Sequence, residues 1–135
     1  MRVLLDTHTL LWAALSPDKL SRNAAAAISD PENVTLVSAA SAWEIATKVR
    51  LGKLPGAEDF ERDFLTSVES AGYSFLSIDA PTALRAGRLI GDHRDPFDRM
   101  IAAQAIAQDM PVWRARLGTA PASFNPSGLS GHICR

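Results

Sequence analysis

Short apolar runs that end in polar residues alternate with helix-like segments along most of this chain. The first run, Val3-Leu4-Leu5, ends at Asp6. Similar runs follow at residues 34–37 and 73–78, and a fourth begins at Met110 and is expected to stop after Val112. Brief, continuous apolar runs are typical of strands that are buried on both faces of a parallel sheet.

Helical spacing fills the intervals between these strands. The expected helices run from Thr7 to Ala14, from the cap residue Ser21 to Asp30, from Ala42 to Arg50, through Phe60, Phe64 and Val68 to Gly72, from Pro81 to near Gly91, and from Phe97 to Gln108. Gly52 stands where the third helix needs a C-terminal cap. This alternation predicts an α/β fold, a three-layer α/β/α sandwich with a mainly parallel sheet and right-handed crossovers.

Composition limits the classes of function open to this chain. Its 135 residues suffice for one domain. Fourteen Lys and Arg against fifteen Asp and Glu give a net charge of -1, so contact with nucleic acid requires a local basic patch. The single Cys134 excludes a disulfide framework and a cysteine zinc cluster. Without a signal peptide or a transmembrane run of roughly 18 apolar residues, we expect a cytoplasmic protein with no membrane partner.

Two acidic residues occupy positions where a functional site would form. Asp6 follows the first strand, and ligands of open α/β sheets bind beyond the carboxyl ends of strands. Asp6 would equally serve as the N-cap of the helix that begins at Thr7. Glu44 lies early in its helix, near the positive helix end. The alternative interpretation is that Glu44 forms an exposed i,i+4 ion pair with Lys48, and the spacing alone favours this alternative.

The densest polar cluster runs from His93 to Arg99 and leads directly into an Ala-rich helix. Asp95 precedes Pro96 at the first helical position, so it is predicted to be the N-cap. Asp98 lies one turn inside the helix, where the same cap does not explain it. Asp98 is therefore the stronger functional candidate, although the i,i+3 spacing lets both carboxylates face one site.

Carboxylates from three separate segments, Asp6, Glu44 and Asp98, supply the oxygen ligands that a hard cation such as Mg²⁺ requires. Such an ion activates water and stabilises the charged transition state of phosphodiester hydrolysis. Zinc is a poorer choice, because the three histidines are widely separated in the sequence.

Three segments resemble the PIN-domain family, and within it the VapC-type toxins of bacterial type II toxin–antitoxin modules. They are Leu4 to His8, Ser41 to Ile45 and, most specifically, His93 to Ala105. The resemblance covers about residues 1–112 and implies a PIN-like domain there. It also implies an endoribonuclease dependent on Mg²⁺ or Mn²⁺, in which activated water attacks an RNA phosphodiester. A cognate antitoxin would place its C-terminal segment in the active-site groove, and the toxin would commonly be a homodimer.

The resemblance carries over to individual residues. The residues that match the metal-binding catalytic acids are Asp6, Glu44 and Asp98, and Asp95 matches an additional catalytic acid of this subgroup. The polar Thr7 and Ser41 are expected to lie near these acids and to contact substrate.

Two arginines of the third segment are candidates for contact with RNA. Arg94 and Arg99 would hold phosphates, since arginine forms bidentate contacts with them. The alternative is a surface salt bridge from either arginine to Asp92 or Asp95, and the sequence leaves both open.

The match to the family ends after the fourth strand. PIN domains usually carry a fourth acid at this point, whereas this chain has Trp113-Arg114-Ala115-Arg116 and no Asp or Glu after Asp109. We interpret residues 113–135 as an atypical, irregular C-terminal tail. A shifted reading frame or a remodelled C-terminus would produce such a change, and the other frames of the coding DNA would test this. An arginine that reaches the acidic cluster would pair with an acid and compete with the cation.

The altered tail keeps two functions open. One is an active metal-dependent ribonuclease toxin, and the other is a catalytically weak or inactive PIN domain that binds antitoxin or RNA. An antitoxin would need an apolar groove. Its candidate lining residues are Leu11, Trp12, Trp43 and Leu51, which core packing would also explain.

Overall fold

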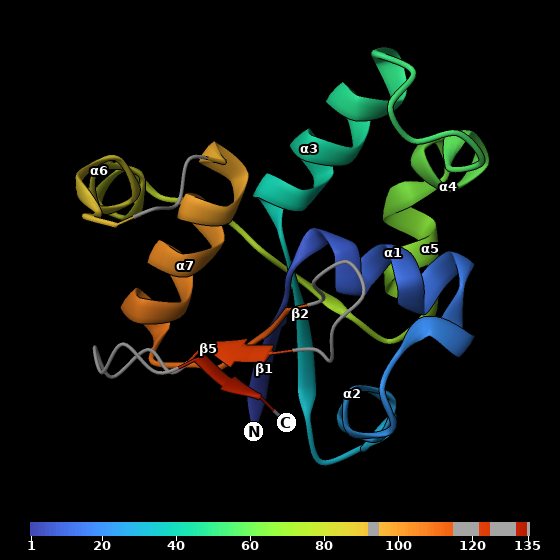
Figure 1. The fold of residues 1–135 in the computed structure, drawn as a ribbon, viewed down its shortest axis with the longest axis horizontal. Coiled ribbons are helices and arrows are strands. Elements are labelled where there is room, and N and C mark those ends of the chain that lie inside the picture. The colour runs from blue at the N-terminus through green and yellow to red at the C-terminus, as the bar shows by residue number, and fades with distance from the viewer. Residues whose placement is uncertain (92–94, 115–121, 125–131, 135) are drawn as a thin grey trace.

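The computed structural model describes residues 1–91, 95–114, 122–124 and 132–134, whose arrangement is shown in Figure 1. The strands are β1 (Arg2–Leu5), β2 (Val34–Ser38), β3 (Ser74–Leu76), β4 (Val112–Arg114), β5 (Ala122–Phe124) and β6 (His132–Cys134). The helices are α1 (Thr7–Leu15), α2 (Arg22–Ser29), α3 (Ala39–Arg50), α4 (Glu58–Arg62), α5 (Phe64–Ser70), α6 (Ala80–Arg88) and α7 (Pro96–Gln108), with a short 3-10 helix, η1 (Pro17–Lys19), after α1. In this described part of the chain, every helix is too short or too polar to cross a bilayer.

The strands form one sheet in the order β3-β2-β1-β4-β5-β6. The four strands from β3 to β4 are parallel, with Leu4 of β1 opposite Leu36 of β2 and Val112 of β4. The last two strands extend the sheet in antiparallel fashion beyond β4. The mainly parallel sheet expected from the sequence is therefore confirmed.

Side chains that alternate along the central strands divide the core into two layers. One layer contains the buried residues Val3, Leu5, Leu10, Leu11, Ala24, Val37, Ile45, Phe64, Val68 and Trp113. The other contains Leu4, Leu36, Ala40, Ile101, Ala105, Met110 and Val112. Figure 1 shows α6 and α7 on one side of the sheet and α1, α2, α4 and α5 on the other. The α/β fold is thus a three-layer α/β/α sandwich, as predicted.

Two helix boundaries differ from the sequence-based expectation. The single helix expected through Phe60, Phe64 and Val68 is two helices, because the chain bends at Asp63. The Phe60 and Phe64 rings are in contact across the bend, with 5.4 Å between their centroids, and α5 buries Phe64 and Val68 in the core. Helix α3 starts at Ala39 rather than Ala42, since the Ser38 hydroxyl caps it by accepting a 2.9 Å hydrogen bond from the Ala40 amide.

The fourth strand continues beyond the expected end at Val112. It includes Trp113 and Arg114, and the Trp113 carbonyl accepts a 2.9 Å hydrogen bond from the Asp6 amide. The interpretation of the tail as irregular is corrected at β5 and β6, whose three-residue strands are too short to show an alternating pattern in the sequence. Residues 115–121 and 125–131 lie outside the described part of the chain. The division into domains at residue 112 stays a prediction.

Candidate functional site

Three elements bring the predicted acids to the carboxyl end of the parallel strands. Asp6 directly follows β1, Glu44 lies in the helix that follows β2, and Asp98 lies in the first turn of α7. The rings of Trp43 and Phe97 meet edge to face with centroids 4.8 Å apart. Because each ring neighbours an acid in the sequence, this contact holds the Glu44 region of α3 beside the Asp98 region of α7.

Asp6 is buried and has the capping role that the sequence left open. Its Oδ1 accepts a 2.8 Å hydrogen bond from the Thr9 amide, so it is the N-cap of α1. Burial raises the pKa of Asp6 to about 6, against the opposing effects of the Thr9 hydrogen bonds and the charges of His8 and Arg114. Capping does not exclude a second role, since a carboxylate has two oxygens.

Glu44 forms the predicted pair with Lys48, but the pair is not an exposed one. Glu44 is only 2% exposed, and Lys48 Nζ donates a 2.5 Å hydrogen bond to its Oε2. Partial burial alone would lower the pKa of Lys48, but the hydrogen bond and the charge of Glu44, with the charges of Asp95 and Asp98, raise it. The other carboxylate oxygen, Oε1, is buried and has no hydrogen-bond partner within the described residues.

Asp95 has the capping role that the sequence predicted, whereas the functional role of Asp98 stays a prediction. Asp95 is the N-cap of α7, with Oδ1 accepting hydrogen bonds from the amides of Phe97 at 2.8 Å and Asp98 at 3.5 Å. Asp98 is half-buried, and burial followed by the negative charge of Asp95 raises its pKa. The charge of Glu44 adds to this rise, whereas Arg114 opposes it. The carboxylates therefore lie within electrostatic range of one another.

The donor set fits a hard divalent cation, although the protein shell is incomplete. In the described part of the chain, no three His, Cys, Asp or Glu side chains converge on one point as a ready-made metal cluster. Magnesium at phosphoryl-transfer sites, however, is held by one or two carboxylates together with waters and substrate oxygens. Asp6 and Asp98 offer such carboxylates, and the unsatisfied Oε1 of Glu44 is a third oxygen donor. The three-acid metal site remains a prediction.

Two hydroxyl groups expected near the acids contact each other directly. Thr7 Oγ1 and Ser41 Oγ are buried and lie 3.0 Å apart, in hydrogen-bond contact between α1 and α3. Thr7 follows Asp6, and Ser41 lies one turn before Glu44, so this contact ties the segments of two acids together. Their contact with substrate stays a prediction.

Arg99 has a structural role that neither alternative from the sequence included. Its Nε donates to the Ala86 carbonyl at 3.1 Å, and its Nη2 donates to the carbonyls of Gly87 and Leu89. These bonds satisfy carbonyls at the end of α6, which explains how α6 is fixed against α7. Contact of Arg99 with RNA stays a prediction, and Arg94 lies outside the described residues.

Sequence reasoning did not identify two further features of the site. One is the burial of Arg114, which is 7% exposed at the end of β4. The other is the buried hydrogen bond from Ser38 to Gln104, which links β2 to α7. The unusual Trp113-Arg114 sequence was a signal for the first, whereas an ordinary serine and glutamine gave none for the second.

Comparison with known proteins agrees with this fold. The chain is similar to Ribonuclease VapC16 of Mycobacterium tuberculosis (strain ATCC 25618 / H37Rv), with 48% identity over 61 residues that span 44% of this chain and 43% of that protein. Its fold is similar to the crystal structure of VapBC2 from Rickettsia felis bound to a DNA fragment from their promoter, with a TM-score of 0.57, 15% identity, and coverage of 87% of this chain and 90% of that one. The PIN domain family matches residues 3–113. Because that match covers most of the sequence, the chain belongs to the PIN-domain family.

Proposed function

We propose that this protein is a VapC-type toxin, an endoribonuclease that hydrolyses RNA phosphodiester bonds with Mg²⁺ or Mn²⁺. The observation that carries the proposal is the collection of acids from three segments at one end of the sheet, where burial and then the negative charges of Asp95 and Glu44 raise the pKa of Asp98. Carboxylates within electrostatic range of one another favour a cation between them. The 48% identity to a protein named as a ribonuclease supports the choice of RNA.

The chain's own side chains would hold and orient the reacting groups. Asp6 is fixed by its hydrogen bond from the Thr9 amide and Asp98 by its place on α7, so these two carboxylates would hold the cation. Glu44, whose Oε2 accepts a hydrogen bond from Lys48, would add a third carboxylate to this acidic site. When bound, the cation supplies an activated water and offsets charge at the phosphate. Thr7, Ser41, Arg94 and Arg99 are the proposed contacts to RNA.

A protein antitoxin is the proposed partner, supported by the likeness of fold to the VapBC2 complex. Of the four residues expected to line an apolar groove, Leu11 is buried in the core and Trp12 is half-buried. Trp43 on α3 and Leu51 at its C-terminal end are 62% and 51% exposed, so these two are accessible for contact with an antitoxin segment. A homodimer and a cytoplasmic location are further parts of this proposal.

Cleavage of a panel of tRNA and rRNA fragments by the purified protein tests the activity. Each fragment is incubated with Mg²⁺, with Mn²⁺ and with chelator, using wild type, Asp6→Asn and Asp98→Asn. Metal-dependent cleavage by wild type and its loss in both variants are expected. Both substitutions keep the side-chain shape while removing an anionic metal ligand.

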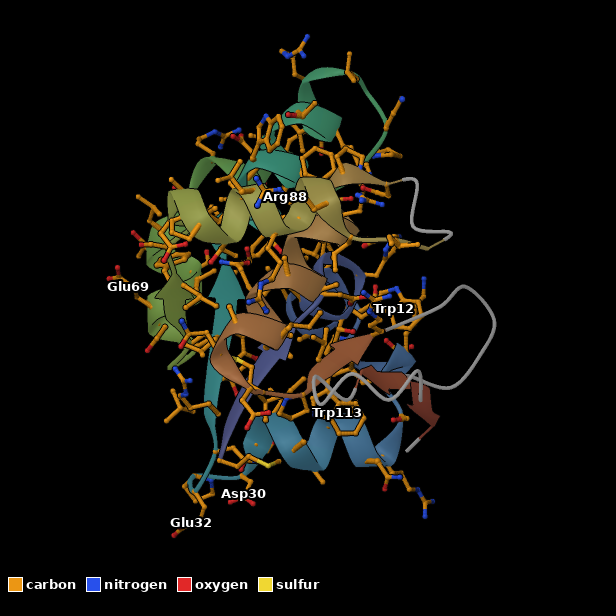
Figure 2. The ribbon with its side chains drawn as sticks, turned by 90° about the vertical axis from the view of Figure 1, so that its left-hand side faces the viewer. Trp12, Asp30, Glu32, Glu69, Arg88 and Trp113 are labelled. Carbon is orange, nitrogen blue, oxygen red and sulfur yellow. The ribbon has the colours of Figure 1, made fainter. Side chains whose placement is uncertain are left out.

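Glu32→Gln is the matched control. Figure 2 shows Glu32 beside Asp30 at the end of the molecule where the strands begin, away from the carboxyl ends that hold the site. This variant should cleave as wild type does. Cleavage that persists in Asp6→Asn, or that is unaffected by chelator, would refute the proposed site.

The second candidate is an inactive PIN domain that binds RNA or antitoxin. The observation that favours it is the positive charge of Arg114 beside Asp6 and Asp98, in the place where the family usually has an acid. If wild type cleaves nothing but shifts the fluorescence anisotropy of labelled RNA, this candidate replaces the first.

A further inference from the structure

The position of Arg114 is set by the pairing of two neighbouring parallel strands. Leu5 of β1 lies opposite Trp113 of β4, and the Asp6 amide donates a 2.9 Å hydrogen bond to the Trp113 carbonyl. The Thr9 hydroxyl donates to the same carbonyl at 3.2 Å. Asp6, which directly follows β1, and Arg114, the last residue of β4, therefore lie at the same edge of the sheet.

Alternation along β4 gives the direction of the Arg114 side chain. Val112 belongs to the core layer beneath α7, and Trp113 belongs to the opposite layer with Ala24 of α2. Figure 2 shows the Trp113 ring over α2. Successive side chains of a strand point to opposite faces, so Arg114 lies on the same face as Val112. On that face the N-terminal turn of α7 carries Asp98, one turn before the core residue Ile101.

The charges agree with this placement. Arg114 is 7% exposed, so its guanidinium is largely out of water. Its charge lowers the pKa of Asp6 and of Asp98, against the larger opposing effect of burial in each case. A buried arginine is stable only beside anions or hydrogen-bond acceptors, and these two carboxylates are anions within its range.

We propose that the Arg114 guanidinium acts as an internal cation of the acidic site, neutralising Asp6 and Asp98 and competing with the divalent metal for them. This inference rests on the proposed metal site. A divalent ion entering the site must separate the guanidinium from the carboxylates or share them with it. The competition weakens metal binding, so the site fills only at higher concentrations of the metal ion. The reason is that positive charges close together in a partly buried site repel each other strongly.

Metal affinity, measured without RNA, tests the competition. Binding of Mn²⁺ to the full chain is followed by isothermal titration calorimetry and by loss of the free Mn²⁺ electron paramagnetic resonance signal. Arg114→Met keeps an unbranched apolar stem and removes the guanidinium charge, so Mn²⁺ should bind at least about tenfold more tightly than to wild type. Arg114→Lys keeps the charge and should stay close to wild type. Arg22→Met on α2 removes an exposed arginine near the other end of the sheet and should change nothing.

A second measurement, a titration of wild type with Arg114→Lys used only to assign the signal, covers the case in which Arg114→Met does not fold. The Nε–Hε signal of Arg114 is identified in a ¹⁵N spectrum by its loss in Arg114→Lys. Titration with Mg²⁺ should shift this signal along the same saturation curve as metal binding, because the guanidinium leaves its carboxylates. A signal that does not respond while metal binds would overturn the inference.

The outcomes also separate this inference from the proposed function. Equal affinity of wild type and Arg114→Met, or weaker binding by the variant, would overturn the competition and leave the metal site intact. Absence of Mn²⁺ binding in both proteins would overturn the metal site as well.

Discussion

The Ser38 hydroxyl donates a 2.5 Å hydrogen bond to the side-chain carbonyl of Gln104, and both groups are buried. The Gln104 amide group in turn donates to the carbonyls of Leu76 at 3.4 Å and Ser77 at 3.2 Å. Ser38 also caps α3. One glutamine of α7 is therefore bonded to the ends of β2 and β3 and to the start of the helix that carries Glu44, which fixes the position of α7 and its Asp98.

Gln104→Ala should lower the free energy of unfolding by about 2 kcal/mol, because buried polar groups of Ser38, Leu76 and Ser77 lose their partner. Urea denaturation measures the loss. Gln108→Ala, at an exposed position of the same helix, is the control and should cost no more than about 0.5 kcal/mol. Equal losses in the two variants would show that the buried hydrogen bonds contribute little.

Asp6 should make stability depend on pH. Its pKa rises from 3.8 to about 6 on folding, so between these values the folded protein retains a proton that the unfolded chain releases. The associated stability is present below about pH 4 and is lost as pH rises through 6, a change of up to about 3 kcal/mol. Asp6→Asn cannot ionise and still offers an oxygen to the Thr9 amide.

Urea unfolding of wild type and Asp6→Asn between about pH 4 and pH 7 measures this effect. The variant should become steadily more stable relative to wild type as pH increases, and saturating Mg²⁺ should reduce the difference at pH 7, since a cation favours the ionised form. A difference that is constant across this range would contradict the raised pKa.

Lys48→Met should destabilise the protein by about 2 kcal/mol or more, because Glu44 would then be a buried charge without its ammonium partner. Lys48→Arg keeps the charge and should recover most of the loss. Thermal unfolding of both variants with and without Mg²⁺ provides the readout. If Glu44 belongs to the metal site, Mg²⁺ should raise the melting temperature of Lys48→Met more than that of wild type. An equal rise in the two proteins would separate Glu44 from the metal.

Two glycine substitutions should change the free energy of unfolding in opposite directions. Gly52 ends α3 with a φ of 72°, so Gly52→Ala forces a left-handed conformation and should cost about 1 kcal/mol. Gly87 lies within α6, and nothing would meet an added Cβ within 4 Å. Gly87→Ala should therefore stabilise the protein by about 0.5 kcal/mol. Chemical denaturation of the two variants compares them, and a loss at both positions would contradict the difference in backbone conformation.

Local rules were sufficient where a role depends on near neighbours in the sequence. The capping positions of Ser21 and Asp95 and the glycine after α3 are confirmed, because each depends on a few residues of one helix end. The break at Asp63 was not predicted, since the apolar spacing of Phe60, Phe64 and Val68 continues across it and no Gly or Pro marks the position.

The structure places the three predicted acids at one edge of the sheet, but the sequence did not predict their electrostatics. Asp6 and Asp98 were identified from their places at a strand end and a helix start. The spacing suggested that Glu44 and Lys48 form an exposed pair, whereas the fold buries the carboxylate. Burial depends on segments far apart in the sequence, so i,i+4 spacing cannot report it.

The sequence by itself determined the α/β class, the alternation of strands and helices, and the family, because apolar periodicity and the motif from His93 to Ala105 are local properties. Only the tertiary structure decided that Ser38 meets Gln104 and that Arg114 lies beside Asp6. The first contact follows from the packing of α7 on the sheet and the second from the register of β1 and β4, and they join residues 66 and 108 positions apart in the sequence. The sequence states which side chains are charged, but the packing of distant segments determines whether each charge is paired, buried or solvated.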